Sequence, residues 1–444
     1  MHAVFALVRA AVRVHLVAAA IVTALIALPA VANDVLKWNE TTVKAAIAGG
    51  QNPIQQTRTV AMVQAAVHDA LNAIKPRYAA YYFEGPAAAG ATPEAAVAAA
   101  SRTVLAAVIP SFGAPPQRAE ALALVEEAYR AALSTIPDGP AKQDGIAAGQ
   151  AAGEAMLALR KDDGATRSAP YTPASGPGRW RPHPNPDPPN PPIKDPKLVP
   201  GFAASTLPGW GNVTPFTLLS ASQYWLPGPP ALTSAQYARD FNEVKSVGGQ
   251  VSTVRTPEQT EIARFWFEGP SAWYRVARAA SEARGLEAWD SARALAAVSL
   301  AMADSYIAGF KIRYVYDFWR PVTAIREAAD DGNDATVADP TWNSLQNTPA
   351  VSDYPSTQSL FSGAATAVLA GILGTDQVAF TITSGPPYAN IKRSFTSLSQ
   401  AARESADSRI YAGIHFRSAC DDGLVLGRKI GQRVVASYLQ PLRN

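Results

Sequence analysis

The chain has 444 residues and a formal net charge of +3, with 48% hydrophobic and 17% charged residues. This composition excludes wholesale disorder, and the near-neutral balance argues against a nucleic-acid-binding protein, which needs a basic face for phosphate contacts. The single cysteine, Cys420, excludes an intrachain disulfide, and together with only five histidines it leaves no zinc-ligand pattern. The length suits two to three domains or one large helical body.

Residues 1–32 have the organisation of a secretory signal. Two arginines precede an apolar stretch from Leu16 to Leu28, and Ala30-Val31-Ala32 has the small-x-small form that signal peptidase reads. We expect cleavage before Asn33 and an exported protein, periplasmic or secreted, with no membrane contact after cleavage and no later apolar run of membrane length. An uncleaved anchor is the alternative, although the stretch is shorter than the ~20 residues of a membrane span.

Residues 33–169 are expected to form an N-terminal helical region of four or five helices. Helix formers are separated there by breakers, at Gly49-Gly50, Pro110 and Pro137-Asp138-Gly139. Within this region Val60–Ile74 has apolar residues at three- and four-residue steps, which predicts a helix with one apolar face. His68 lies beside that face, and we interpret it as a packed or capping histidine rather than a ligand.

Residues 170–233 change to proline, glycine, asparagine and tryptophan. The proline run from Pro182 to Pro192 cannot be helical, because proline lacks the amide donor and restricts its predecessor. This segment is either a linker or an ordered wrap, and its aromatic residues favour a wrap on the helical body, because disordered linkers contain few of them. We expect His183 on the solvent side.

Residues 234–444 return to helical patterns and are expected to form a C-terminal bundle. Thr256-Pro257-Glu258-Gln259 predicts a capped helix start, and two further helices are expected over Leu286–Ile312 and Ser359–Leu373, the latter ended by Gly374. Alternation typical of strands does not appear over a useful length. The fold class predicted is therefore mainly α.

Three separated segments of this C-terminal half concentrate cationic and small polar residues. Pro355-Ser356-Thr357 directly precedes a helix, whose free amides and dipole favour an anion. The forked donors of an arginine suit a tetrahedral oxyanion, and His415 is the nearby side chain able to attack or coordinate its central atom. The alternative is that the arginines form ordinary salt bridges to Asp317, Glu327 or Asp407. The arginines concerned are Arg313, Arg320 and Arg409.

Together the three segments resemble the signature K-x6-R-P, P-S-G-H and S-R-x5-H-x3-D of vanadium-dependent haloperoxidases and type 2 phosphatidic acid phosphatases, in particular a secreted bacterial haloperoxidase-like branch. The spacing from Arg313 to Arg320 and from Arg409 to His415 matches. The resemblance implies a helical bundle that binds vanadate or phosphate. Arg313, Arg320, Ser356, Thr357, Arg409 and His415 would hold this anion, with His415 as the axial vanadium ligand or the phosphoryl nucleophile, and catalysis would fall to His415, Gln358 and Arg313.

Four positions depart from this signature. Arg313 stands where the family has lysine, and Lys311 is two residues too early. Thr357 replaces a glycine that lies close to the oxyanion, which would narrow the pocket. Gln358 replaces the acid/base histidine and cannot exchange a proton near neutral pH, a loss that typically costs ~10²–10⁴-fold in rate. Ala419 replaces the aspartate that orients the histidine, so His415 is expected to lack its usual partner.

The resemblance leaves three functions open. The first is a vanadate-dependent haloperoxidase that uses hydrogen peroxide to oxidise a halide or a small organic substrate. The second is an acid phosphatase of the same fold that needs no cofactor, with phosphate as the substrate group. The third is a non-catalytic oxyanion-binding protein. A homodimer also remains open. Each function requires Arg320, Ser356, Arg409 and His415 to converge on one pocket.

Overall fold

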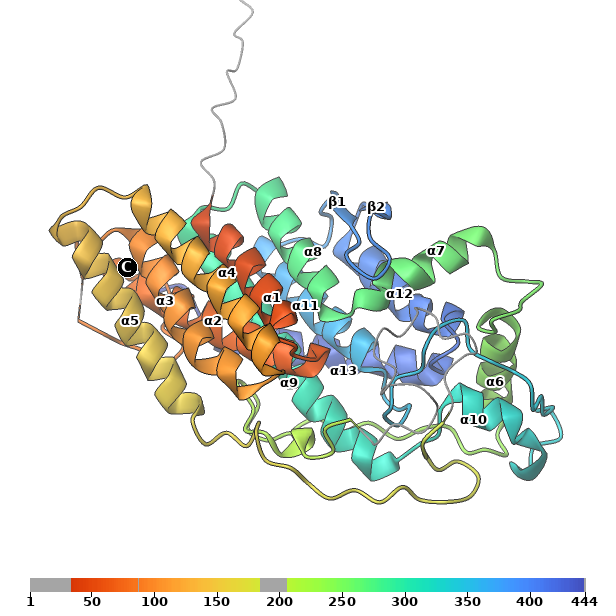
Figure 1. Ribbon diagram of the computed structural model, residues 1–444. Coiled ribbons are helices and arrows are strands. Elements are labelled where there is room, and N and C mark those ends of the chain that lie inside the picture. The colour runs from red at the N-terminus through yellow and green to blue at the C-terminus, as the bar shows by residue number, and fades with distance from the viewer. Residues whose placement is uncertain (1–32, 87, 184–205, 443–444) are drawn as a thin grey trace, which may run out of the picture.

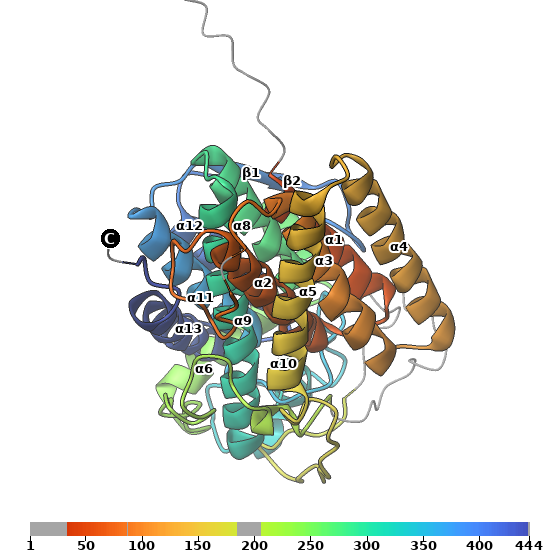
Figure 2. The same ribbon diagram turned by 90° about the vertical axis from the view of Figure 1, so that its left-hand side faces the viewer.

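The computed structural model describes residues 33–86, 88–183 and 206–442, which fold mainly as α-helices. This part contains thirteen α-helices, four short 3-10 helices and one two-stranded sheet, which confirms the predicted mainly α class. Figures 1 and 2 show the helices from two directions. The predicted signal segment, residues 1–32, and residues 184–192 of the proline run lie outside the described residues.

The N-terminal region contains five helices, in agreement with the four or five expected. Proline occupies the first turn of four of them, where its missing N–H removes no helical hydrogen bond. In Figure 1 these helices lie together at the left of the molecule. They are α1 (Asp34–Ala48), α2 (Pro53–Ile74), α3 (Pro93–Val108), α4 (Pro115–Ser134) and α5 (Pro140–Arg160), with a 3-10 turn at Ile109–Ser111.

The helix expected over Val60–Ile74 forms within α2, but the prediction of a single apolar face is wrong. Its side chains from Gln56 to Ala73 are all buried, because α2 packs against α1, α3, α5 and α9. His68 is fully buried, with Nδ1 3.0 Å from an Asp69 carboxylate oxygen. The same carboxylate accepts hydrogen bonds from three successive backbone amides, at residues 81–83. His68 is therefore the packed histidine that the sequence indicated.

The described parts of 170–233 lie on the helical body as an irregular wrap. Trp180 is completely buried, and its backbone amide donates to the Asp317 carbonyl over 2.8 Å. The Asp304 carboxylate of α9 accepts from the amides of Phe216 and Thr217 at 2.6 and 2.7 Å. The expectation for His183 is wrong: its side chain is buried, edge-on to Trp180, because the wrap folds this tryptophan inward. The boundaries at 169/170 and 233/234 remain predictions.

The C-terminal half contains eight helices and a short hairpin that the sequence did not indicate. The capped start at Thr256–Gln259 is confirmed, and Gly374 ends its helix with φ 71°. The helices are α6 (Ala235–Val247), α7 (Pro257–Phe265), α8 (Pro270–Ala283), α9 (Ala288–Tyr316), α10 (Pro321–Arg326), α11 (Thr357–Leu373), α12 (Leu398–Tyr411) and α13 (Arg417–Ser437). The antiparallel strands are β1 (Phe380–Thr383) and β2 (Lys392–Phe395), and the 3-10 turns are Trp210–Asn212, Trp266–Glu268 and Ala328–Asp330.

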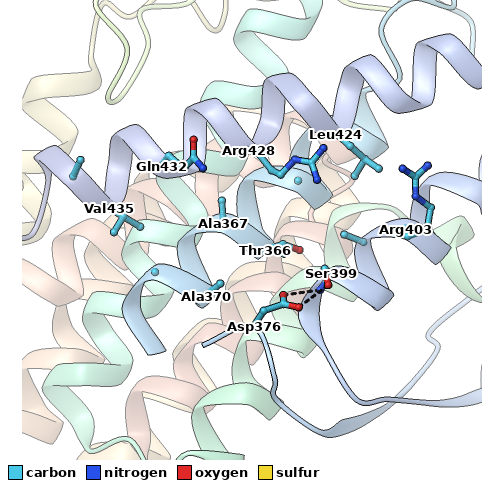
Figure 3. Close-up of a pocket in the computed structure, with 14 residues that line it drawn as sticks. Thr366, Ala367, Ala370, Asp376, Ser399, Arg403, Leu424, Arg428, Gln432 and Val435 are labelled. Atoms are coloured by element: carbon cyan, nitrogen blue, oxygen red, sulfur yellow. Dashed lines mark hydrogen bonds between the residues drawn. The ribbon is translucent and has the colours of Figure 1, made fainter. Parts of the chain in front are cut away.

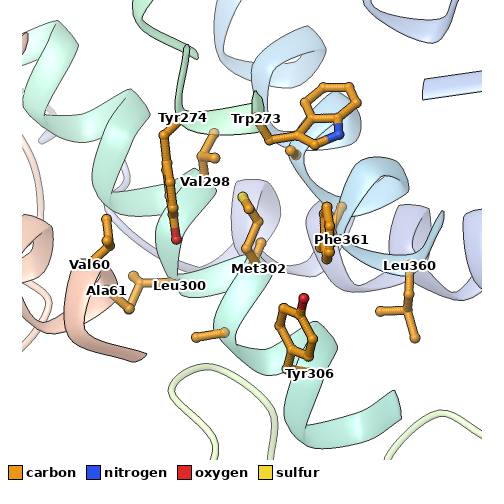
Figure 4. Packing of buried hydrophobic residues seen from close by; sticks show 14 of the residues in the cluster. Val60, Ala61, Trp273, Tyr274, Val298, Leu300, Met302, Tyr306, Leu360 and Phe361 are labelled. Atoms are coloured by element: carbon orange, nitrogen blue, oxygen red, sulfur yellow. The ribbon is translucent and has the colours of Figure 1, made fainter. Parts of the chain in front are cut away.

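Helix α9 is the central element of the hydrophobic core. It packs against α2 from the N-terminal region and against α8, α11 and α13 from the C-terminal half, so one core spans both. Figure 4 shows Met302 and Tyr306 of α9 among side chains of α2, α8 and α11. The ring of Tyr306 lies 5.4 Å from that of Phe361, centroid to centroid. The last turns of α9, which carry Arg313, are fixed by this packing.

Two described helical stretches are long and apolar enough to cross a membrane, contrary to the expectation of no later apolar run of that length. They are Pro93–Ser111 and Ala288–Tyr316. The second stretch is α9, and 94% of its most apolar segment is buried inside the protein, as is typical of a core helix.

Helices α11 and α13 approach each other closely at glycines of α13. A Cβ atom added at Gly427 would lie 1.9 Å from the Leu360 carbonyl oxygen, and one at Gly423 would lie 2.7 Å from the Ser356 carbonyl oxygen. Both contacts are with the first turn of α11 or the residue that caps it. The glycines of α13 therefore set the position of the α11 N-terminus.

We predict that Gly427→Ala destabilises the protein. In an exposed helix this change stabilises by about 0.5–1 kcal/mol, but here the methyl group forces two backbones apart, which typically costs about 1–3 kcal/mol. Urea unfolding followed by circular dichroism measures the change in unfolding free energy. Lys429→Ala, an exposed substitution on the same helix, is the control and should change it by less than about 0.5 kcal/mol.

Candidate functional site

One cavity of about 350 Å³ collects most of the residues that the sequence analysis selected. They come from the last turn of α9, the residue that caps α10, the first turn of α11, the last turn of α12 and the turn before α13. Gly413, with φ 79°, permits the turn before α13. A Cβ atom at this position would lie 2.1 Å from the Gly248 carbonyl oxygen. The predicted residues that line the cavity are Arg313, Arg320, Thr357, Gln358, Arg409 and His415.

Ser356 is beside this cavity but is not part of its lining. It caps α11, where its hydroxyl oxygen accepts from the Ser359 amide at 3.3 Å and from the Ser359 hydroxyl at 3.1 Å. Its predicted role as a donor to the anion stays a prediction. Lys311 also lies elsewhere, with Nζ 3.4 Å from the Asn212 side-chain oxygen. Arg313, and not Lys311, therefore holds the position of the family lysine.

Two of the three arginines, Arg313 and Arg320, donate mainly to backbone carbonyls. Arg313 Nε donates to the Pro355 carbonyl over 2.8 Å, and Arg320 donates to the carbonyls of Val351 and Ile414, each over 2.6 Å. Three buried guanidinium nitrogens, Arg320 Nη2 and Arg409 Nε and Nη1, have no hydrogen-bond partner among the described residues. Buried donors are nearly always paired, so these nitrogens indicate a missing acceptor.

The salt bridges proposed as the alternative do not form. Asp317 accepts a hydrogen bond from the Tyr171 hydroxyl over 2.6 Å. Glu327 pairs with Arg181, and Asp407 pairs with Arg417. The carboxylate that does approach the cavity is Asp353, 3.7 Å from Arg320 Nη1. Three cations therefore face the site against one carboxylate.

Burial and mutual repulsion shift the pKa values in this cluster. Burial lowers the pKa of Arg313 and of Arg409 to about 10, so both remain charged at neutral pH. Burial, followed by the nearby arginines, lowers the pKa of His415 well below its usual value. His415 is therefore neutral at pH 7. Burial also raises the pKa of Asp353 to about 7, although Arg320 and Arg313 act to lower it.

Asp353 is the site residue that the sequence analysis missed. One of its carboxylate oxygens lies 2.8 Å from His415 Nδ1. As expected, His415 lacks its usual partner, because Ala419 offers no carboxylate, but Asp353 is an acidic neighbour that was not expected. Asp421 pairs with Arg403, and Asp422 accepts from the Tyr354 hydroxyl. The sequence feature that could have indicated Asp353 is its position immediately before the Tyr354-Pro355-Ser356 segment.

The two substitutions at the start of α11 are accommodated by their neighbours. The Thr357 methyl carbon packs over Gly309 of α9, where a Cβ would be 3.0 Å away, so Gly309 supplies the room. Gln358 Nε2 donates to the Trp266 carbonyl over 2.9 Å. Because a carbonyl oxygen can only accept, this contact fixes the orientation of the amide. Gln358 lines the cavity as a held amide that cannot transfer protons.

The rest of the cavity wall is largely apolar and was not foreseen. Ile54 at the start of α2, Phe267, Phe310 and Val351 contribute to it, so the N-terminal region helps to enclose the site. Tyr306 also lines it, one helical turn before Phe310. The cavity wall thus combines apolar side chains with a few charged groups, as small-molecule sites commonly do.

A second cavity, of about 480 Å³, lies between α11, α12 and α13 (Figure 3). Its walls are mostly small or apolar side chains, with Asp376 and Arg403 at the edge. Asp376 accepts from the Ser399 hydroxyl over 2.6 Å, and Arg403 pairs with Asp421. Arg428 also lines this cavity, but its side chain is exposed. The smaller cavity is the better anion site, because its unpartnered guanidinium nitrogens are buried.

Comparisons with known proteins agree with this site. The family profile described as the VCPO second helical-bundle domain matches residues 293–444, which contain every signature residue. Vanadium chloroperoxidase from Curvularia inaequalis is 26% identical over 351 residues, which cover 61% of this chain and 55% of that protein. The chain thus spans about half the length of this relative.

Solved structures extend the likeness to the whole fold. A bacterial vanadium-dependent iodoperoxidase matches with a TM-score of 0.77 and 25% identity over 93% of this chain and 98% of that one. The holo form of a bacterial vanadium-dependent chloroperoxidase matches with a TM-score of 0.69 and 18% identity, over 87% and 91% of the two chains, and shows a shared fold. These likenesses support the assignment of the chain to the superfamily of vanadium-dependent haloperoxidases, with residues 293–444 as the segment that matches the family profile.

We predict that Arg409→Ala weakens oxyanion binding about 10- to 100-fold, the value of one or two charge-assisted hydrogen bonds. Titration calorimetry with orthovanadate and, separately, inorganic phosphate measures the dissociation constants. Arg403→Ala is the matched control, because this arginine lies on the same helix but faces the second cavity. Equal affinities of Arg409→Ala and the unmodified protein would show that the anion binds elsewhere.

Proposed function

We propose that this protein is an exported vanadium-dependent haloperoxidase, which binds vanadate and uses hydrogen peroxide to oxidise a halide or a small organic sulfide. The observation that carries the proposal is the set of unpartnered guanidinium nitrogens of Arg320 and Arg409 around neutral His415. Vanadate oxygens are acceptors of the charge and number that such donors suit. The vanadium dependence of the structural relatives supports the same ligand.

The residues present fit vanadate through charge and donor geometry. Arg320 Nη2 and the free nitrogens of Arg409 would donate to its oxygens, Arg313 would add positive charge, and His415 would hold the vanadium through Nε2. Bound vanadate supplies the electrophilic centre at which hydrogen peroxide and halide react, with the overall balance H₂O₂ + X⁻ + H⁺ → HOX + H₂O. The chain's own contribution is electrostatic preorganisation, because the buried guanidinium groups are held in place before the anion binds.

The reaction consumes a proton, and the residue at the position of the acid/base histidine cannot donate one. Gln358 occupies the position of the acid/base histidine, and its amide is held by Trp266. An amide does not exchange protons near neutral pH, so this position cannot supply the proton. We therefore propose a slow haloperoxidase. Export rests on residues 1–32 and, like a homodimer, remains part of the proposal.

Phosphatase activity uses the same anion cradle, and the neutral His415 could act as its nucleophile. A phosphoryl transfer also requires protonation of the leaving group, and Gln358 cannot provide it. This alternative is therefore weaker for most substrates and strongest for aryl phosphates, whose leaving groups need little protonation.

The direct test is peroxide-dependent halogenation. Protein reconstituted with orthovanadate should brominate or iodinate a phenol dye, and His415→Ala should abolish the reaction, whereas His183→Ala, which removes a histidine outside the cavity, should retain it. If calorimetry shows bound vanadate but no halide is oxidised at any pH, the activity is refuted and a non-catalytic anion-binding protein remains. Hydrolysis of an aryl phosphate without vanadate would instead support the phosphatase.

A gain of activity provides a further prediction. Gln358→His should raise the halide oxidation rate about 100-fold at saturating peroxide, since general acid–base catalysis typically contributes about 10²–10⁴-fold. Steady-state kinetics measures the rate constant, and vanadate affinity is measured alongside. Gln358→Asn is the control, because it shortens the side chain without adding a proton donor. A rate that stays the same in both variants would contradict the role assigned to this position.

A further inference from the structure

The two ring nitrogens of His415 face groups of opposite charge. Nε2 is 2.9 Å from Arg320 Nη1, whereas Nδ1 is 2.8 Å from an Asp353 carboxylate oxygen. The same Arg320 nitrogen is also 3.3 Å from Nδ1, the longer of its two contacts with the ring. A guanidinium only donates hydrogen bonds, so the nitrogen nearer to it must present a lone pair. The ring proton of neutral His415 then lies on Nδ1, toward Asp353.

Asp353 is held in place as an acceptor for this N–H group. It is 1% exposed, and its amide donates to the Phe318 carbonyl over 2.8 Å, while its carbonyl accepts from Arg313. Neither carboxylate oxygen has a well-aligned hydrogen bond among the described residues, although one is within 2.8 Å of the imidazole. A rotation of the ring that directs its N–H at this oxygen would satisfy both groups. The competing acceptor is the Asp353 main chain, which also interacts with His415.

The position that normally supplies such a carboxylate cannot do so here. Ala419 has no polar side chain, and its carbonyl accepts from the Ser356 amide over 2.9 Å. Asp422, three residues further, is engaged by the Tyr354 hydroxyl at 2.6 Å. Asp353 reaches His415 from another segment, the loop before α11. The structure therefore moves the partner of the histidine from α13 to this loop.

We propose that the Asp353 carboxylate is the positioning residue of His415: it accepts a hydrogen bond from Nδ1–H, fixes the ring orientation and keeps the Nε2 lone pair on the cationic side of the cavity. Hydrogen-bonded carboxylates orient ligand histidines in this way, and their loss typically lowers metal affinity about 10- to 100-fold. The purpose of this contact, which is to orient His415 toward vanadate, rests on the proposed function. The tautomer it assigns is a property of the protein alone.

The test begins with protein free of vanadate. Nitrogen-15 NMR of the imidazoles reports the tautomer, and the chain contains only five histidines, two of them within residues 1–32. His415 should be a single Nδ1–H tautomer in the unmodified protein. Asp353→Asn should populate the Nε2–H form and weaken orthovanadate binding about tenfold or more. Asp422→Asn, a partly buried aspartate closer in sequence, should change neither measurement.

A second-site variant separates positioning from packing. Asp353→Asn combined with Ala419→Asp returns a carboxylate to α13 and should restore the Nδ1–H tautomer and part of the vanadate affinity. If Asp353→Asn keeps the original tautomer and affinity, the main-chain carbonyl is sufficient and the proposal is wrong. An Nε2–H tautomer in the unmodified protein overturns it without any variant. Failure of halide oxidation with these NMR results intact would refute only the proposed function.

Discussion

The structure depends on three arginines buried around one neutral histidine. Removing a guanidinium from water is costly, and carboxylates do not offset the cost here, since one acid faces three cations. Backbone carbonyls take their place: those of Val351, Pro355 and Ile414 accept from the arginine nitrogens. The loops that carry these carbonyls can therefore lack regular secondary structure without leaving buried acceptors unpaired. Arg320 Nη2 and two nitrogens of Arg409 have no partner among the described residues and are free for an anion.

Much of the site could be predicted from sequence because the signature spacing is local. Arg313 and Arg320 are joined by a helix end and its cap, and Arg409 and His415 by one tight turn, so the spacing nearly determines their separation. Asp353 could not be predicted as the partner of His415, because that contact joins segments 62 residues apart and depends on how the loop before α11 packs on α13. Asp421 and Asp422, which are nearer to His415 in sequence, bind Arg403 and Tyr354 instead.

The fold was predictable where patterns were long and was missed where they were short. Capping residues located the start of α7, and Gly374 the end of α11. The four-residue strands β1 and β2 offer too few alternating positions to stand out. For α2 the apolar spacing was read correctly, but its polar residues did not indicate a solvent face, since His68, Asp69 and Asn72 bond to one another and to nearby backbone. A helix face whose polar side chains are mostly hydrogen-bonded can therefore be buried.

The irregular wrap contributes to the site through α9. Asp304 binds the wrap amides at residues 216–218, and the α9 cap at Asp317 binds Tyr171 and the Trp180 amide. These contacts fix α9 on both sides of the segment that carries Tyr306, Phe310 and Arg313. A proline-rich chain suits this purpose, because its restricted backbone loses little entropy when it is ordered. The wrap thus keeps Arg313 in place although Arg313 has no carboxylate within salt-bridge distance among the described residues.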